Sequence, residues 1–164
     1  MIAAAAWSAD ATLSRSSGMP DIDGTVEAGE YDAEVEFDEL VCSFTLLEDG
    51  RLAAGLVGNT EGWIAMGFGS NRMNGAHIVI GFVRRGDAEL KEQTGRGHRH
   101  SDAGSMLVDE WDMGEEDGAT SLELIIDVND LVSGSVLDFI TAYSKRDGFR
   151  SIHAGREIGS LELR

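Results

Sequence analysis

The chain has 164 residues and a mass of 17.6 kDa, enough for one domain that buries its own core without disulfides or a structural metal. Its 30 acidic and 13 basic residues give a formal net charge of −17, which argues against nucleic acid or an anionic membrane surface as a partner. Hydrophobic residues make up 42% of the chain, which excludes a solvated acidic tail, and the longest uncharged apolar run, residues 2–7, is too short to cross a bilayer.

Residues 1–20 are rich in alanine and serine and have no sustained hydrophobic period. Two interpretations stay open: a flexible N-terminal extension, or the remainder of a secretory signal with its small-residue cleavage zone. In either case we expect these residues to contribute little to the fold. The domain itself is assigned to residues 21–164.

From residue 21 onward the chain reads as strands separated by turns. The acidic segment 21–39 contains alternating apolar residues from Tyr31 to Phe37, which predict a turn leading into a strand. Further alternating or wholly apolar segments follow between glycine-containing turns, at residues 40–46, 51–57, 63–68, 76–83, 122–126, 137–143 and 158–163. With no convincing amphipathic helix and no internal repeat, the pattern predicts an all-β sandwich or barrel of roughly eight to ten short antiparallel strands.

The single cysteine, Cys42, limits the redox chemistry of the chain. No intramolecular disulfide is possible, and no CxxC or CxxCH motif is present, which excludes a thioredoxin-type pair and covalent c-type haem. Because Cys42 alternates with Leu40 and Phe44, we expect it to be a small buried apolar side chain.

No catalytic motif of a hydrolase or nucleotide-binding protein occurs, and close carboxylate pairs are expected by chance among so many acids. His77 lies in an apolar strand, where a hydrogen-bonded core or edge histidine is the default. His98, His100 and Asp102 share a glycine-rich loop and could bind a divalent cation, but the neighbouring arginines oppose this, so an exposed loop is favoured.

Met73 and His153 lie in two polar loops, each beside a strongly apolar strand. A methionine in such a loop is unusual unless its thioether covers something. A thioether and an imidazole that converge at one end of a sandwich would suit axial ligation of haem iron. Residue chemistry by itself leaves this open, because two loop residues eighty positions apart prove no contact.

The stretch from Gly62 to Val83 resembles the core signature of DOMON domains. It contains a Gly-Trp-Ile-Ala-Met-Gly-Phe-Gly strand, the loop methionine Met73, and a second apolar strand. The resemblance extends over residues 24–163, with Gly29-Glu30-Tyr31 upstream and with His153 and Arg156 downstream. Two positions depart from the family pattern. His77 stands where the family usually has Asp, and Glu157 stands where a glycine often follows the arginine that comes after the histidine.

The resemblance implies an immunoglobulin-like β-sandwich, usually outside the cytoplasm, similar to the cytochrome domain of cellobiose dehydrogenase and to haem domains fused to membrane cytochromes b. In haem-bearing members a loop methionine and a late histidine hold a non-covalent b-type haem, and these fall on Met73 and His153. His77 is then a competing ligand or a neighbour of the haem edge. The wall of the haem pocket is expected from the apolar residues near both loops: Trp63, Met66, Phe68, Tyr143 and Phe149.

We therefore expect a single-electron carrier, or a redox subunit, that is not a catalyst by itself. The expected partner is a redox protein with a basic docking surface or a membrane-bound one, although salt adaptation would also explain the acidic surface. The expected location is extracytoplasmic, that is periplasmic, secreted or on the cell surface. The alternative is a haem-free module that binds a carbohydrate or similar ligand, which the low aromatic content of 7% disfavours.

Overall fold

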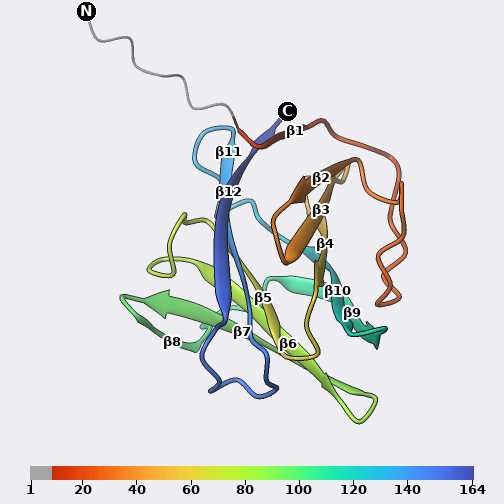
Figure 1. Cartoon of the computed structure of the whole chain (residues 1–164). Helices are drawn as coiled ribbons and strands as arrows, with labels where there is room; N and C mark the ends of the chain where they lie inside the picture. The colour runs from red at the N-terminus through yellow and green to blue at the C-terminus, as the bar shows by residue number, and fades with distance from the viewer. Residues whose placement is uncertain (1–8) are drawn as a thin grey trace, which may run out of the picture.

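A computed structural model describes residues 9–164, which form twelve β-strands and no helix (Figure 1). A seven-stranded sheet has the spatial order β1 (Ala11–Leu13), β12 (Gly155–Leu163), β11 (Val136–Tyr143), β5 (Ile64–Phe68), β6 (His77–Arg84), β7 (Asp87–Arg96), β8 (Arg99–Asp102). A five-stranded sheet has the order β2 (Ala33–Glu36), β3 (Leu40–Leu46), β4 (Leu52–Gly58), β10 (Ala119–Ile126), β9 (Val108–Glu116). The predicted all-β sandwich is confirmed, and among the strand pairs of residues 9–164 β1 and β12 are parallel while the others are antiparallel.

The main core lies between the two sheets. Phe44 of β3 and Phe139 of β11 are fully buried, and their ring centroids lie 5.1 Å apart across the interface. Cys42 is completely buried in the same core, as predicted, and burial raises the pKa of its thiol to about 12. The thiol is therefore protonated at neutral pH and acts as an apolar packing group.

Three strands were not anticipated from the sequence: β7, β8 and β9. Each carries polar side chains on an exposed face, so its apolar alternation is weak. The hairpin turns do carry a local signal. Asp117 and Gly118, which join β9 to β10, both have positive φ angles (51° and 79°), as a type I′ turn requires, and Asp-Gly is a typical sequence for that turn.

The expectation for residues 1–20 is corrected where the structure describes them, from residue 9 onward. Ala11–Leu13 form β1, which pairs in parallel with the end of β12 and closes one edge of the seven-stranded sheet. Leu13 is 1% exposed and belongs to the main core. Three residues are too few to show a period, so only the tertiary contact identifies the strand. Residues 1–8, and with them most of the expected signal remnant, lie outside the described residues.

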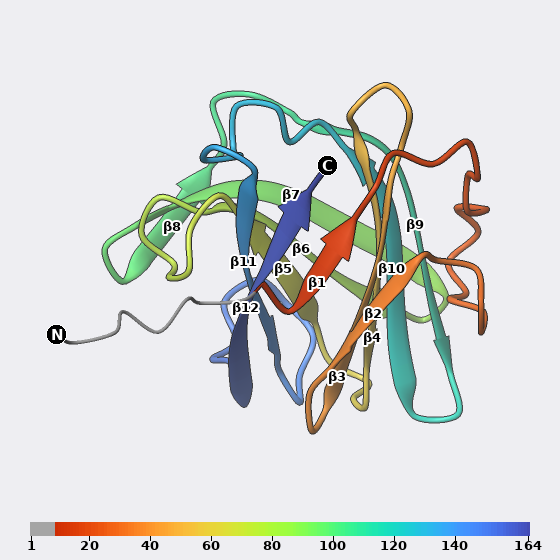
Figure 2. The same cartoon turned by 90° about the horizontal axis from the view of Figure 1, so that it is seen from above.

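The segment between β1 and β2 runs along the outer side of the five-stranded sheet (Figure 2). It is held there by Glu123 of β10, which is completely buried and accepts hydrogen bonds from the backbone N–H groups of Asp23 and Gly24 and from the Tyr31 hydroxyl (3.0, 2.9 and 2.9 Å). Burial raises the pKa of Glu123, and the Tyr31 hydrogen bond lowers it. Together with hydrogen bonds from the Asp32 N–H to the Thr45 hydroxyl and from the Ser121 hydroxyl to the Gly24 carbonyl, this carboxylate holds residues 14–32 against the sheet.

Replacing Leu13 with Ala should lower the free energy of unfolding by about 2–5 kcal/mol, because it removes a buried side chain where the edge strand meets the core. Chemical denaturation measures the change. Thr12→Ala, at the exposed neighbouring position of β1, is the control and should stay within about 0.5 kcal/mol of wild type. Equal stability of the two variants would contradict the role of β1.

Replacing Tyr31 with Phe should cost about 1.5–3 kcal/mol of unfolding free energy at neutral pH, because a buried carboxylate loses a hydrogen-bond donor. The Tyr31 hydroxyl favours the ionised form of Glu123. The stabilisation that this hydrogen bond adds to the folded state is therefore complete above the raised pKa of Glu123. It declines as the pH falls through that pKa and Glu123 becomes protonated.

Urea titrations of both proteins at several pH values measure this difference. Tyr143→Phe is the matched control, because the Tyr143 hydroxyl makes no hydrogen bond within residues 9–164. A Tyr31→Phe cost that grows as the pH falls would show that the assigned hydrogen bond is wrong.

Candidate functional site

The seven-stranded sheet has a second apolar cluster on its outer face, on the side away from the other sheet. The buried members come from β5, β6 and the residues next to them: Trp63, Ala65, Ala76, Ile78, Ile80 and Phe82. Met73, Ile140, Ala142 and Phe149 are partly buried against them. Because β5 and β6 are apolar on both faces, this side of the sheet needs a cover as much as the core side does.

The first loop beside this face, between β5 and β6, carries Met73. Its backbone lies against Gly95 of β7 so closely that a Cβ on Gly95 would overlap the Met73 carbonyl group. The contact is completed by the Gly75 N–H, which donates to the Gly95 carbonyl, and by the Gly97 N–H, which donates to Asn74 Oδ1 (3.0 and 2.8 Å). Glycine at position 95 therefore places Met73, whose side chain is half-buried against the outer cluster.

The second loop, between β11 and β12, carries His153. The His153 side chain is exposed, but the backbone on both sides of it is anchored. The Ser144 hydroxyl donates to the Ile152 carbonyl (3.0 Å), and the Ala154 N–H donates to the Tyr143 carbonyl (2.7 Å). Trp63 Nε1–H donates to the Ser151 carbonyl (3.1 Å), which ties the loop to the outer face.

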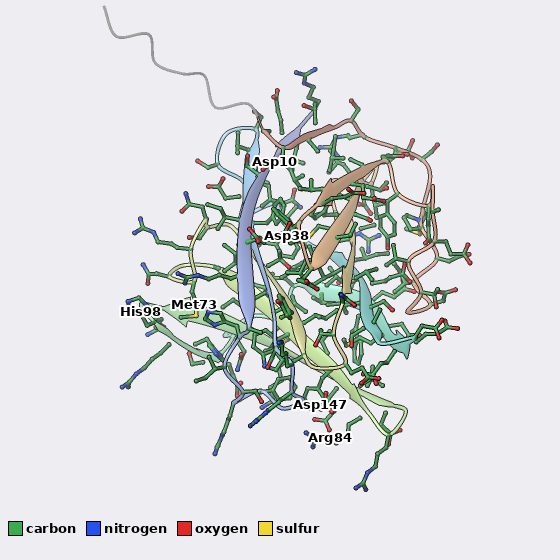
Figure 3. All side chains as sticks on the ribbon, viewed as in Figure 1. Asp10, Asp38, Met73, Arg84, His98 and Asp147 are labelled. Atoms are coloured by element: carbon green, nitrogen blue, oxygen red, sulfur yellow. The ribbon has the colours of Figure 1, made fainter. Side chains whose placement is uncertain are left out.

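The two loops lie at opposite ends of the outer face, whereas the sequence analysis expects them at one end. The reason is the antiparallel register of β5 and β11, in which Phe68 pairs with Phe139 and Ile64 with Tyr143. The loop after β5 and the loop after β11 are thus separated by the length of β5, about 13 Å at 3.3 Å per residue. Figure 3 shows the same separation, with Met73 near the β7–β8 hairpin and Asp147 of the His153 loop at the other end of the sheet.

Strand alternation divides the predicted pocket wall between two faces. Trp63 lies on the outer face, in the same cluster as Met73. Met66 and Phe68 are fully buried in the main core, and Tyr143 packs against that core as well. The outer wall is instead formed by Ala65, Ile78 and Ile80, which the sequence reasoning did not select, although the parity of Trp63 within the strand pointed to Ala65.

Part of the outer face is apolar and open to solvent. Ile158 of β12 pairs with Ile140 of β11 on this face and is 58% exposed, and Ile152, next to His153, is 85% exposed. Gly67 of β5 is buried on the same face, and the side chains of Ile140 and Ala76 fill the space that a Cβ on Gly67 would need. Large exposed isoleucines beside an apolar cluster indicate a place where an apolar group of a ligand or partner can bind.

The other histidines lie elsewhere. His77 is on the inner face of β6, where its Nε2 is 2.8 Å from Oε1 of the buried Glu92, which also accepts the backbone N–H groups of Leu107 and Val108. The default for His77, a hydrogen-bonded core histidine, is confirmed, and the sheet separates this ring from the outer face. His98 and His100 are exposed on the β7–β8 hairpin, as favoured.

A cleft of about 830 Å³ lies at the His153 end of the outer face, between the ends of β6 and β7 and the loop 144–154. Phe82 and Phe149 line it with ring centroids 4.9 Å apart. Neither Met73 nor His153 is among its lining residues. The cleft therefore adjoins His153 without including it, since Ile152 and Ala154 on either side of His153 line it.

Charge is distributed unequally between the two halves of the sandwich. Residues 21–61 and 108–130, which contain the five-stranded sheet, hold twenty-one acidic residues and one arginine. Residues 72–99 and 145–156, around the outer face of the other sheet, hold ten of the 13 basic residues. The strongly acidic surface expected from composition is thus confined mainly to one half of the molecule.

No profile of a known protein family matches the chain, and no curated protein sequence matches it. Solved structures share its fold. The cytochrome domain of cellobiose dehydrogenase from Myriococcum thermophilum superimposes with a TM-score of 0.60 and 11% identity over 80% of this chain and 81% of that one. The cytochrome b domain of pyranose dehydrogenase from Coprinopsis cinerea gives 0.59 and 9% over 75% and 76%.

A carbohydrate-binding module of family 9 from Caldicellulosiruptor kristjanssonii, solved in complex with glucose, gives a TM-score of 0.50 and 13% identity over 93% of this chain and 95% of that one. At these identities the three similarities establish the fold and not a function. Among residues 9–164 there is also no helix with the length and apolar character needed to cross a membrane.

Replacing Gly95 with Ala should displace the Met73 loop, because the added Cβ would overlap the Met73 carbonyl group. We expect a loss of about 1–3 kcal/mol in unfolding free energy, the usual cost of overpacking, and chemical-shift changes centred on residues 70–76. Gly104→Ala is the control, since nothing lies within 4 Å of its Cβ, and it should be neutral or slightly stabilising. Unchanged shifts around Met73 in Gly95→Ala would contradict the packing.

Proposed function

We propose that this chain is an electron-transfer domain that binds a non-covalent b-type haem, with Met73 and His153 as its axial ligands. The observation that carries the proposal is the placement of these side chains on two loops that flank one apolar face from opposite ends. Two ligands that approach from opposite ends can bind opposite sides of one planar group. The fold shared with two cytochrome domains supports the proposal.

The residues present fit such a group. The face between the loops is apolar and bordered by the exposed Ile152 and Ile158, so an apolar molecule bound there would bury side chains that now face water. In the part of the chain from residue 9 to residue 164 no group of three or more His, Cys, Asp and Glu is placed to hold a metal ion. The porphyrin supplies four donors to a haem iron, so one thioether and one imidazole complete the set.

The protein would contribute position and seclusion. The anchored backbone around His153 and the close contact between Gly95 and the Met73 loop would fix the backbone position of each ligand. Trp63, Ile78 and Ile80 would exclude water from the side of the haem that faces the sheet. When bound, haem supplies one-electron redox chemistry, at a potential that a methionine ligand raises. With both axial positions taken by side chains, no position remains for a substrate, which favours a carrier over a catalyst.

The partner and the location remain predictions. The acidic half of the sandwich fits the expected redox partner with a basic docking surface, since charge complementarity increases the rate of encounter. An extracytoplasmic location is part of the same proposal.

A haem-free module for a carbohydrate or similar ligand is the second candidate function. The cleft beside Phe149 favours it, because its volume of about 830 Å³ lies within the range of about 300–1,000 Å³ that is usual for small-molecule sites. The two functions predict different colours for the purified protein. A protein that stays colourless and is unchanged by incubation with haemin would support the second candidate.

With haem, the protein should show a low-spin spectrum with a Soret band, and acidified organic solvent should extract the pigment because no CxxCH motif attaches it. His153→Ala should abolish or greatly weaken haem binding. Met73→Ala should keep haem but shift the spectrum toward high spin, and Met73→His should stay low-spin at a lower reduction potential, since a thioether stabilises ferrous iron better than imidazole does.

The matched controls are His98→Ala and His100→Ala, two exposed histidines on the same sheet, which should leave the spectrum unchanged. The ligand assignment would be wrong if Met73→Ala and His153→Ala both kept the wild-type spectrum while a control lost it.

A further inference from the structure

The cleft at the His153 end of the outer face is lined by an unusual concentration of positive charge. Its basic lining residues are Arg84, Lys91, Lys145, Arg146 and Arg150. They include both lysines of the chain, against only two acidic lining residues, Glu89 and Asp147. A protein with a formal charge of −17 therefore has a cleft of net positive charge.

These cations lack the carboxylate partners that an acidic protein could easily supply. Among residues 9–164, Arg84 is the only one of the five with a carboxylate within 4 Å, and its distance to Asp147 is 3.8 Å. Two of them lie over aromatic rings, Arg84 over Phe82 and Lys91 over Phe149, at 5.0 and 4.8 Å from the centroids. Grouped unpaired cations repel one another, and a bound anion would remove that cost.

The cleft also contains a hydrogen-bond acceptor, the carboxylate of Asp147. The Asp147 side chain is 26% exposed, and its Oδ2 lies 3.8 Å from Arg84 Nε, beyond hydrogen-bond distance. A ligand hydroxyl can therefore donate a hydrogen bond to this carboxylate. Arginine forks bind carboxylate and phosphate in the same planar geometry, so the anionic group of the ligand can be either.

From these three features we propose that the cleft binds an acidic sugar, a hydroxylated small molecule with a carboxylate or phosphate group. Its anionic group binds the guanidinium groups of Arg146 and Arg150. One hydroxyl donates to Asp147, and its apolar face lies against Phe149. The site goes beyond the proposed electron-transfer function, because it needs neither Met73 nor His153.

Calorimetric titration of the purified haem-free chain at low ionic strength tests the proposal with four probes: galacturonate, glucose 6-phosphate, glucose and inorganic phosphate. At least one of the two acidic sugars should bind at least about tenfold more tightly than glucose and inorganic phosphate, since each of these lacks one of the two recognised groups. Galacturonate and glucose 6-phosphate distinguish a carboxylate ligand from a phosphate ligand. Equal affinity for all four probes, or binding of none, would overturn the proposal.

Two variants separate the recognised groups. Arg146→Gln combined with Arg150→Gln should weaken the preferred acidic sugar by about 100-fold, whereas Arg96→Gln combined with Arg99→Gln, the same charge change on the β7–β8 hairpin, should have little effect. Asp147→Ala should remove the preference for that sugar over inorganic phosphate, and inorganic phosphate should bind more tightly because a negative charge has been removed from the cleft. An Asp147→Ala variant that keeps the preference would show that the hydroxyl assignment is wrong.

Three further measurements distinguish an acidic-sugar site from part of the haem site and from a docking surface for a protein. Met73→Ala and His153→Ala should bind the acidic sugar like wild type, so loss of haem ligation leaves the result intact. Competition between haemin and the sugar would instead assign the cations to the carboxylates of the haem. Tight binding of polyglutamate without sugar binding would make the cleft a docking surface for an acidic protein. Either outcome would overturn the proposal.

Discussion

The central strands β5 and β6 of the seven-stranded sheet are apolar on both faces, and this constraint governs the rest of the structure. A sheet in water normally buries one face and exposes the other, and its strands then alternate apolar and polar residues. In β5 and β6 the residues of both parities are apolar, so the five-stranded sheet covers one face and something else must cover the other. Two loops, one carrying Met73 and one carrying Phe149 and His153, provide part of that cover.

The loops reach the outer face because small residues and backbone hydrogen bonds allow it. Gly95 lets the Met73 loop lie directly on β7, and the Trp63 indole and Ser144 hydroxyl hold the His153 loop through its carbonyl groups. These contacts fix the backbone of the loops and leave the Met73 and His153 side chains at opposite ends of an incompletely covered apolar surface. Such a surface is suited to a planar apolar molecule, which is the basis of the proposed haem site.

Electrostatics separates the molecule in the same way as packing does. The acidic residues gather on the five-stranded sheet and its connections, where Glu123 is the one that is completely buried and holds the chain before β2. The basic residues gather around the outer face of the other sheet, and five of them line one cleft. The net charge of the whole chain therefore does not predict the charge of either half, and each half presents a different surface to a partner or ligand.

The sequence determined the strands whose side chains alternate strongly, the buried thiol of Cys42, and the residue types of the candidate ligands, because these follow from local periodicity and side-chain chemistry. It did not determine β1, β7, β8 and β9, whose apolar alternation is too short or too weak to predict a strand. Pairing with neighbouring strands makes these segments extended. Alternation separates Trp63 from Met66 and Phe68, but the sequence could not decide which of these two faces the second sheet covers. Nor could it place Met73 and His153 at opposite ends of the sheet. Those facts depend on which strands pair and in which register, and residues distant in the chain decide the register through burial and backbone hydrogen bonding.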